Sequence, residues 1–416
     1  MNEAYRIAGI DVHKSMLAVV VTDVAAGGDF HFERRKFGAL GSDLQELSQW
    51  FAELGVREAV MESTAQYWKP VWRQLEGQCV LHLAQAQSNR APRGRKRDFA
   101  DAERLVRRQV AGELILSFVP DVEQRLWRTI THTKYQLTRD RVRLQNQLES
   151  LLEDGRLKLG SCVSDLLGVS SRRMLRAVAQ GESDPATVAA LAEENLQATP
   201  EQLVDALSAV RSLSSLHRQI LKLFLDRLDL IEKQLQILHR QIAKALRRHQ
   251  QAVMRLATVP GFGVDSAQQV IAEVGPSAAT FSSAEQLASW VGVCPGREES
   301  AGVSRSDRSP KGNRMMRRVL MQVAYAAVRT KGSIFQSLFQ RLRTRLGPFK
   351  AMWAICHRIC RLTWKILHQG IEYIEFGQGR DPKKEQHRIN RIIRSLRSLG
   401  YQVIPPVKTD LIQDSE

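Results

Sequence analysis

Four carboxylates in the first quarter of the chain constrain its fold more than any other feature. Asp11 and Glu62 each end a short apolar run. Asp98 and Asp101 stand three residues apart at the start of a helical pattern, so their side chains share one helix face. Each acid alone could equally cap a helix or face solvent. Together, acids at the tips of neighbouring strands and on a closing helix predict a Mg²⁺ site that acts on phosphodiesters.

The pattern around these acids predicts an α/β domain. Runs rich in β-branched residues at 5–12, 17–23 and 30–37 predict three strands. Further along we expect a helix at 42–54, a strand at 57–62, a helix at 66–77, a strand at 79–84 and a helix that begins at Asp98. Three strands, a helix, and then alternating strand and helix is the order of an RNase H-like fold.

Residues 120–250 have the periodicity of helices. Apolar residues recur at spacings of three and four along a predicted long helix of coiled-coil type. The stripe consists of Leu213, Leu216, Ile220, Leu223, Ile231, Leu235, Leu238, Ile242 and Leu246. Two interpretations remain open, an antiparallel hairpin within one chain and a dimerising spacer between catalytic modules.

Residues 256–275 have the pattern of a helix-hairpin-helix. The sequence Pro260-Gly261-Phe262-Gly263 predicts a tight turn between two helices. Glycines at such a turn let backbone N–H groups face a phosphate, so Gly261 and Gly263 are candidate nucleic-acid contacts. A plain packing unit is the alternative.

Basic residues concentrate at the C-terminal end. Residues 301–416 carry 23 basic and 8 acidic side chains, whereas residues 1–300 carry 38 and 36. With aromatic residues interleaved, this excess predicts a nucleic-acid partner rather than acidic lipid. The polar residues expected at nucleic acid are Arg93, Arg95, Lys96 and Arg97 in an early loop, and Arg305, Arg308, Lys311, Asn313, Arg314, Arg317 and Arg318 later in the chain.

No apolar run approaches the ~20 residues that cross a bilayer, so we expect no membrane association. The five cysteines are scattered and odd in number, which fits a reducing cytoplasm. The sequence also lacks a Walker-type loop, which agrees with chemistry that needs no nucleotide cofactor.

The segment 295–313, the serine loop, offers Ser300, Ser304, Ser306 and Ser309 among basic residues. A serine hydroxyl is a poor nucleophile unless a base, a metal or a cationic field activates it. Arginines nearby could bind a scissile phosphate and stabilise its transition state. A flexible loop that only touches backbone phosphates is the alternative, and spacing alone does not decide between them.

Several motifs resemble the DEDD transposases of bacterial insertion sequences. The N-terminal motifs are Gly9-Ile10-Asp11-Val12-His13-Lys14, Met61-Glu62-Ser63-Thr64 and Asp98-Phe99-Ala100-Asp101-Ala102. The C-terminal motifs are Val259-Pro260-Gly261-Phe262-Gly263, Pro295 to Ser300, and Lys311-Gly312-Asn313 followed by Arg317-Arg318. They resemble the IS110 group, which includes Piv-type DNA invertases and bridge-RNA-guided recombinases.

The resemblance implies four regions. They are a RuvC-like metal-binding domain at 1–118, a helical coiled-coil region at 119–250, a mainly α-helical serine transposase domain with the helix-hairpin-helix at 251–372, and a basic tail at 373–416. The quartet would bind Mg²⁺, and Ser300 would be the nucleophile. The family generally shows Ser-Gly directly, whereas Ala301 separates Ser300 from Gly302 here, so Ser304 is the reserve candidate.

The resemblance also implies a function. Serine would attack a DNA phosphodiester and form a covalent phosphoserine link, in a homodimer or tetramer whose protomers complete each other's sites. A structured non-coding guide RNA would specify double-stranded donor and target DNA, and the protein would act at the bacterial nucleoid. The alternatives are a RuvC-like nuclease or junction resolvase that uses water as nucleophile, and a non-catalytic nucleic-acid binder.

Overall fold

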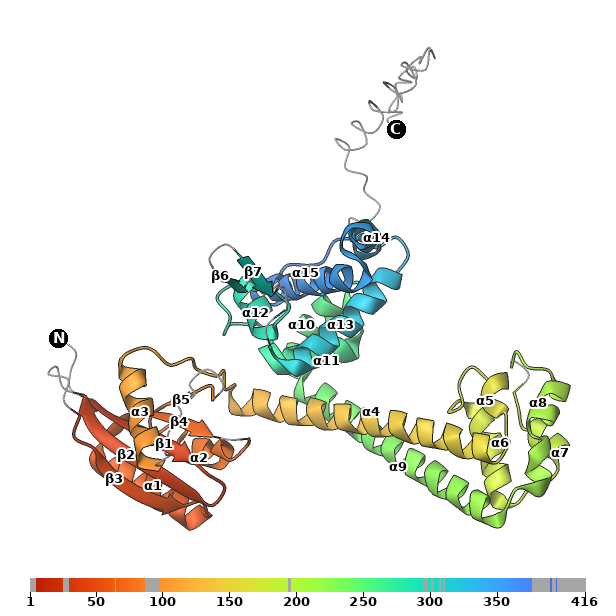
Figure 1. Cartoon of the computed structure of the whole chain (residues 1–416), viewed down its shortest axis with the longest axis horizontal. Helices are drawn as coiled ribbons and strands as arrows, with labels where there is room; N and C mark the ends of the chain where they lie inside the picture. Colours follow the sequence, from red (N-terminus) through yellow and green to blue (C-terminus); the bar gives the residue numbers. More distant parts are fainter. Residues whose placement is uncertain are drawn as a thin grey trace, which may run out of the picture. The chain divides into compact units, whose positions relative to one another are not determined.

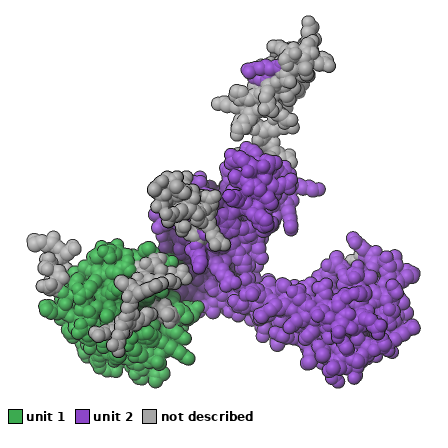
Figure 2. Space-filling view, in the orientation of Figure 1, with its two compact units in different colours: residues 1–121 green, residues 122–416 purple. Residues whose placement is uncertain are grey.

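The computed structural model describes residues 5–24, 30–63, 65–86, 98–193, 196–294, 298–300, 303–306, 309, 311–375, 390 and 394, with the backbone alone at 63, 298–300 and 303–306. The chain divides into two units, residues 1–121 and 122–416 (Figure 2). The first unit combines a β-sheet with helices, and the second unit is mostly helical (Figure 1). Within the described residues, no helix combines the length and the apolar character that crossing a bilayer requires.

A five-stranded sheet forms the centre of the first unit. Its strands are β1 (Tyr5–Val12), β2 (Met16–Val24), β3 (Glu33–Gly38), β4 (Val56–Ser63) and β5 (Val80–Leu83). In space they follow the order β3-β2-β1-β4-β5. Strand β2 is antiparallel to β1 and β3, whereas β4 is parallel to β1 and β5 is parallel to β4. The five predicted strands are present, although β3 begins three residues later than expected.

Helices cover both faces of this sheet. They are α1 (Gly41–Leu54), α2 (Trp68–Leu75) and α3 (Asp98–Val110). On one face, Phe51 of α1 and Leu75 of α2 belong to the same buried cluster as Ile10. On the other face, Leu105 of α3 packs in a separate cluster with Val60. Because successive strand residues point to opposite faces, β1 supplies both clusters, and its residues 7–10 are buried.

An antiparallel hairpin of two long helices begins the second unit. The elements in this part are α4 (Val122–Asp154), α5 (Leu159–Cys162), α6 (Val169–Gln180), α7 (Pro185–Ala189), α8 (Pro200–Ala206), the 3₁₀ turn η1 (Ser208–Ser212) and α9 (Ser215–Ala245). His217 Nε2 lies 2.9 Å from Asp154 Oδ2, and Arg141 Nε lies 3.2 Å from Glu232 Oε1. Residue numbers therefore fall along α4 as they rise along α9, which defines an antiparallel pair.

The apolar row of α9 that faces α4 differs from the predicted one. Leu216 and Leu223 of the predicted stripe are 62% and 65% exposed, whereas Leu221, Leu225 and Leu228 are buried. In this half of the helix, the row buried within the chain is therefore not the predicted stripe. Spacings of three and four fit both rows, because α9 carries apolar residues on more than one face. Packing against α4 and α6 decides which row is buried.

A second core of this unit joins the open ends of the hairpin to the C-terminal helices. These elements are the 3₁₀ turn η2 (Arg247–His249), α10 (Gln250–Ala257), α11 (Val264–Val274), α12 (Ala284–Val291), α13 (Arg314–Arg329), α14 (Ile334–Leu346) and α15 (Pro348–His368). Trp127 of α4 and Ile242 of α9 are buried in the same cluster as Ile271, Leu320 and Ile359. This core therefore crosses residue 250, where the sequence suggested a boundary.

The serine loop contains two short strands, β6 (Glu298–Ser300) and β7 (Val303–Ser306). They pair antiparallel, with Ser300 opposite Val303 and Ser304 opposite Glu299. The sequence was expected to form an irregular loop here, and that expectation was wrong for these residues. Short polar strands lack the apolar alternation on which strand prediction depends.

Candidate metal centre and serine loop

Two of the four predicted acids lie side by side at one edge of the first unit's sheet. Asp11 on β1 and Glu62 on β4 are direct Cα partners in the parallel β1–β4 pair. Directly paired residues of neighbouring strands project from the same face of a sheet. Each acid also stands one residue before the end of its strand. The two carboxylates therefore share the carboxyl-terminal edge of the parallel pair.

A close approach between β1 and α3 carries the other two acids to this face. Gly9 lies two residues before Asp11 and so faces the same way. A Cβ atom on Gly9 would stand 2.3 Å from the carbonyl oxygen of Ala102 on α3, so glycine alone permits this packing. Asp98 and Asp101 occupy the first turn of α3. Glycine at position 9 therefore allows α3, and with it Asp98 and Asp101, to lie close to the sheet.

A histidine joins the cluster. His13 Nε2 lies 3.1 Å from Asp11 Oδ2 and 3.8 Å from Asp98 Oδ1. One ligand atom from each of these three residues lies within 4.8 Å of the others. The sequence motif alone assigned His13 no role beyond that of a neighbour of Asp11. The signal was its spacing of two from Asp11, which puts both side chains on one face of an extended chain.

Negative charge is concentrated around Asp11. Burial is the largest cause that raises the pKa of the Asp11 carboxyl; His13 opposes this shift, and the charges of Asp101 and Asp98 add to it. An acid whose ionised form is disfavoured by neighbouring acids gains most from a cation that they can share. The pKa shift therefore agrees with the geometry in indicating a cation site.

Two basic side chains flank the acids. Arg104 Nη2 lies 3.3 Å from Asp101 Oδ1 and 3.8 Å from Glu62 Oε2. Lys36 Nζ lies 3.5 Å from Asp98 Oδ2. Arg104 thus links an acid of α3 to an acid of β4, whereas Lys36 and His13 both contact Asp98.

The donor set fits a divalent cation. Carboxylate oxygens are the hard ligands that suit Mg²⁺ and Mn²⁺, and an imidazole extends the choice towards transition metals. The Asp11 side chain is 17% exposed and that of Asp98 is 38% exposed, so the cluster is open to solvent and has an entry path. Within the described part of the chain, Asp11, His13 and Asp98 are the residues whose ligand atoms are already within reach of one ion.

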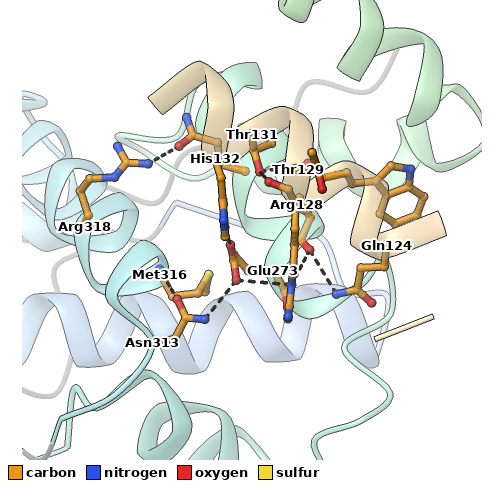
Figure 3. A network of polar contacts seen from close by, with 12 residues as sticks. Gln124, Arg128, Thr129, Thr131, His132, Glu273, Asn313, Met316 and Arg318 are labelled. Carbon is orange, nitrogen blue, oxygen red and sulfur yellow. Dashed lines mark hydrogen bonds and ion pairs between the residues drawn. The ribbon is translucent and has the colours of Figure 1, made fainter. Parts of the chain in front are cut away.

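A second polar cluster, in the second unit, surrounds Glu273 (Figure 3). Glu273 on α11 is buried. Its carboxylate accepts a hydrogen bond from Asn313 Nδ2 (3.0 Å), contacts His132 Nε2, and lies 3.5 Å from Arg128 Nε. Burial acts to raise the pKa of Glu273, but the His132 hydrogen bond and the Arg128 charge outweigh it and lower that pKa.

This cluster fixes the C-terminal end of the serine loop. Asn313 Oδ1 accepts the backbone N–H of Met316 and so caps α13, while its amide nitrogen donates to Glu273 (Figure 3). The preceding Gly312 packs against the end of α12, where a Cβ would stand 2.2 Å from the carbonyl oxygen of Val291. The sequence motifs pointed to neither Glu273 nor His132. The signal for Glu273 was a charged residue inside the otherwise apolar end of α11.

Several side chains expected at nucleic acid have partners within the chain. The Arg317 guanidinium lies 4.9 Å from the ring centre of Trp353, and that of Arg318 lies 4.2 Å from the ring centre of Tyr135. Asn313 is held by Glu273, as described above, whereas Lys311 and Arg314 are exposed. The side chains of Ser300 and Arg305 on the β6–β7 hairpin, and the residues Arg93, Arg95, Lys96, Arg97 and Arg308, lie outside the described part of the chain.

The two glycines of the turn before α11 also make internal contacts. Gly261 has a φ of +88°, and a Cβ there would stand 2.3 Å from the carbonyl oxygen of Val323 on α13. The backbone N–H of Gly263 donates to Ser266 Oγ at 2.9 Å. Packing against α13 and capping of α11 therefore account for these glycines. A phosphate contact at this turn stays a prediction.

Two family models match the chain. The DEDD-type model for IS110 elements, described as a transposase, matches residues 8–155. The model described as the transposase IS116/IS110/IS902 family matches residues 253–340. The first range contains all four predicted acids, and the second contains Glu273 and the serine loop.

Two curated relatives are similar to parts of the chain. The putative transposase y4pF/y4sB of Sinorhizobium fredii (strain NBRC 101917 / NGR234) is 26% identical over 182 residues, which cover 42% of this chain and 46% of that protein. The insertion element IS900 uncharacterized 42 kDa protein of Mycobacterium paratuberculosis is 29% identical over 134 residues, which cover 32% and 33%. The chain thus spans less than half the length of the curated relatives it matches.

Proposed function

The chain belongs to the IS110 group of DEDD transposases, and from this premise we propose that it cuts and rejoins DNA strands to move an insertion sequence. The observation that carries the proposal is the register of Asp11 with Glu62, which puts two acids of the quartet at the ends of paired parallel strands. Acids in this placement, closed by those of α3, suit metal-dependent chemistry on phosphodiesters.

The first unit is proposed to be an RNase H-like, RuvC-like domain. Three antiparallel strands followed by two parallel strands, with helices on both faces, support this assignment. In the second unit, α4 and α9 are proposed to be the coiled coil of the family, and α10, its turn and α11 to be the helix-hairpin-helix. The domain limits suggested by the sequence, 1–118, 119–250, 251–372 and 373–416, remain part of this proposal.

The acids Asp11, Glu62, Asp98 and Asp101 are proposed to hold Mg²⁺, with His13 beside them. When bound, the metal would stabilise the negative charge that develops on a phosphate under attack. Other residues of the chain keep the four acids in place around the metal position. Gly9 lets α3 approach β1, and Arg104 keeps Glu62 and Asp101 together.

Ser300 is the proposed nucleophile, with Ser304 in reserve. The Ser300 Oγ attacks phosphorus, a serine–phosphate bond forms, and the bond from phosphorus to one deoxyribose oxygen breaks. That oxygen takes up a proton and leaves as a hydroxyl. A hydroxyl of a second strand then attacks the phosphoserine, which restores both the diester and the free serine. The number of phosphoester bonds is conserved, so no nucleotide cofactor is needed.

A structured non-coding RNA is the proposed guide. Base pairing between this RNA and double-stranded donor and target DNA would select sequences, while the protein binds phosphates irrespective of sequence. The excess of basic residues in 301–416, with 23 basic against 8 acidic side chains, supports a large polyanionic partner.

A homodimer or tetramer is the proposed assembly, in which Ser300 of one protomer completes the metal site of another. Support comes from a second apolar row on α9. Leu216, Leu223, Leu230 and Ile237 repeat every seven residues and are 62%, 65%, 54% and 49% exposed. A heptad repeat of exposed apolar side chains is typical of a helix that packs against another helix.

Trapping of the covalent intermediate tests this function. Full-length protein is incubated with donor DNA, guide RNA and Mg²⁺, and covalent protein–DNA adducts are resolved on a denaturing gel. We expect Ser300→Ala and Asp11→Asn to abolish the adduct while DNA and RNA binding persist. Ser306→Ala, on the same hairpin, is the matched control and should form the adduct.

Two outcomes would overturn parts of the proposal. An undiminished adduct in Ser300→Ala removes that serine from the mechanism, and its loss in Ser304→Ala would move the role there. Strand cleavage that needs Asp11 but gives no adduct in any protein would favour the hydrolytic nuclease with water as nucleophile.

A further inference from the structure

A cavity of about 1040 Å³ lies between α13, the beginning of α15 and the end of the serine loop. Pockets that bind small ligands commonly measure ~300–1,000 Å³, so this one is large enough for a nucleotide. The residues that matter for the argument are Lys311, Arg317, Tyr325, Phe349, Lys350 and Trp353. Arg317 and Tyr325 stand eight residues apart on α13, and Phe349 and Trp353 stand four apart on α15, so each pair shares a helix face.

Aromatic rings stand at the wall and mouth of this cavity. Phe349 is 83% exposed and Tyr325 is 43% exposed. A phenylalanine this exposed gains little from burial, so packing within the chain does not account for its position. Exposed rings are, however, the surfaces on which unpaired nucleobases stack. The mouth of the cavity therefore has a feature that folding leaves unexplained and a planar ligand would use.

The charged groups of the cavity are basic. Lys311, Arg317 and Lys350 line it, and no Asp or Glu occurs among its described lining residues. The Arg317 guanidinium covers the Trp353 ring at 4.9 Å, and the indole N–H of Trp353 donates to Ser309 Oγ at 2.6 Å. These contacts fix the orientation of the ring and join the cavity to the serine loop. A flat apolar group with an attached anion complements such a site.

We propose that this cavity binds an unpaired nucleotide of single-stranded DNA, with its base on Phe349 and Tyr325 and its phosphate on Lys311 and Lys350. The proposal rests on the proposed function, because the serine loop that supplies Ser309 and Lys311 is the loop assigned to the DNA strand. Stacking on the rings and neutralisation of the phosphate offset the cost of taking a base out of a helix.

The test is equilibrium binding of fluorescent oligonucleotides to the full-length protein in EDTA, where strand cleavage does not occur. Single-stranded DNA carrying 2-aminopurine reports stacking, because a stacked 2-aminopurine loses fluorescence. We expect quenching by the unaltered protein and recovery of fluorescence with Phe349→Ala and Tyr325→Ala. Affinity for single-stranded DNA should fall about tenfold for Phe349→Ala, the scale of one lost stacking contact.

Matched variants separate the cavity from general surface effects. Ile374→Ala removes another exposed apolar side chain of the same unit, and it should leave quenching and affinity unchanged. Lys350→Gln should weaken binding, whereas Lys331→Gln, an exposed lysine outside the cavity lining, should weaken it much less. Phe349 is exposed, so its loss is not expected to unfold the protein.

Each result bears on the proposal. Unchanged quenching and affinity in Phe349→Ala would overturn it. Loss of binding to single-stranded RNA but not DNA would overturn the assignment to DNA, and a change in sedimentation mass with DNA binding intact would assign the cavity to a protein contact. Because no chemistry is measured, intact 2-aminopurine quenching in a protein that forms no serine adduct would contradict the proposed function alone.

Discussion

Asp11 and Glu273 are both carboxylates withdrawn from water, yet their surroundings shift their pKa values in opposite directions. Around Asp11, burial and two further acids raise the pKa, and His13 only partly opposes them. Around Glu273, the His132 hydrogen bond and the Arg128 charge outweigh burial and lower the pKa. The first cluster has an excess of negative charge at a solvent-open edge, whereas the second is compensated inside the protein.

This difference separates a structural acid from a ligand-binding one. The carboxylate of Glu273 on α11 contacts His132 and Arg128 of α4 and accepts a hydrogen bond from Asn313, which caps α13. It therefore connects α11, α4 and α13. Asp11 does not connect several segments in this way, and burial and the neighbouring acids disfavour its ionised form in the folded chain. A charge withdrawn from water stabilises a fold only when its partners compensate it, and a carboxylate whose neighbours include two further acids is a candidate for binding a cation.

The largest effect is expected from Glu273→Gln. The glutamine keeps the shape of the side chain but removes the negative charge 3.5 Å from Arg128 Nε, and loss of one partner from a buried pair costs about 3–5 kcal/mol. Chemical denaturation of the full-length protein should show this loss. The control is Glu285→Gln, whose carboxylate pairs with Arg361 at the surface and should give no measurable change. Equal stability of the two variants would contradict the structural role of Glu273.

The next effect is expected from Gly9→Ala. The added methyl group would stand 2.3 Å from the Ala102 carbonyl oxygen, so α3 must move away from β1. Overpacking of this kind costs about 1–3 kcal/mol, and it would also displace Asp98 and Asp101. Denaturation and calorimetric titration with Mn²⁺ measure the two consequences. Gly41→Ala, where a Cβ would meet nothing within 4 Å, should change neither.

A smaller effect is the pH dependence of the Glu273→Gln difference. The pKa of Glu273 lies below its ordinary value of 4.5, so the folded state binds this proton less tightly than the unfolded state does. The stabilisation is therefore complete above pH 4.5 and is lost as pH falls through the folded pKa. We expect the two proteins to converge in stability over that range. In a His132→Gln background the convergence should begin at higher pH, and an unchanged onset would exclude His132 as a cause.

The local sequence pattern was sufficient to predict the strands and helices of the first unit. It was not sufficient to predict which face of α9 is buried in the second unit. Strand β1 was recognisable because Ile7 and Ile10 belong to a short β-branched and apolar run that ends in an acid. On α9, by contrast, Leu221 and Leu223 are equally apolar, and only packing against other helices of the unit makes one buried and the other exposed. Sequence periodicity identifies a helix, whereas its buried face depends on a partner far away in the chain.

The same limit applies to the polar clusters. Asp11 and Glu62 were predicted as a pair because both end apolar runs, although their register depends on strand pairing that the sequence does not display. Glu273 was overlooked because its partners, His132 and Asn313, are 141 and 40 residues away. A charged residue in an apolar helical run marks such a cluster, but it does not name the residues that compensate it.

The smallest change in stability, and the sharpest test of the comparison, is expected from Asp11→Asn. In EDTA the amide removes a charge that burial and neighbouring acids disfavour, so the melting temperature should stay the same or rise slightly. With Mn²⁺ or Mg²⁺ at about 100 times its dissociation constant, the unaltered protein should gain about 2.7 kcal/mol, and the variant should lose most of that gain. Glu53→Gln, an exposed acid on α1, is the control and should keep it. The opposite result would be a variant whose melting temperature in EDTA is well below that of the unaltered protein but which metal stabilises equally. In that case Asp11, like Glu273, would have a structural role.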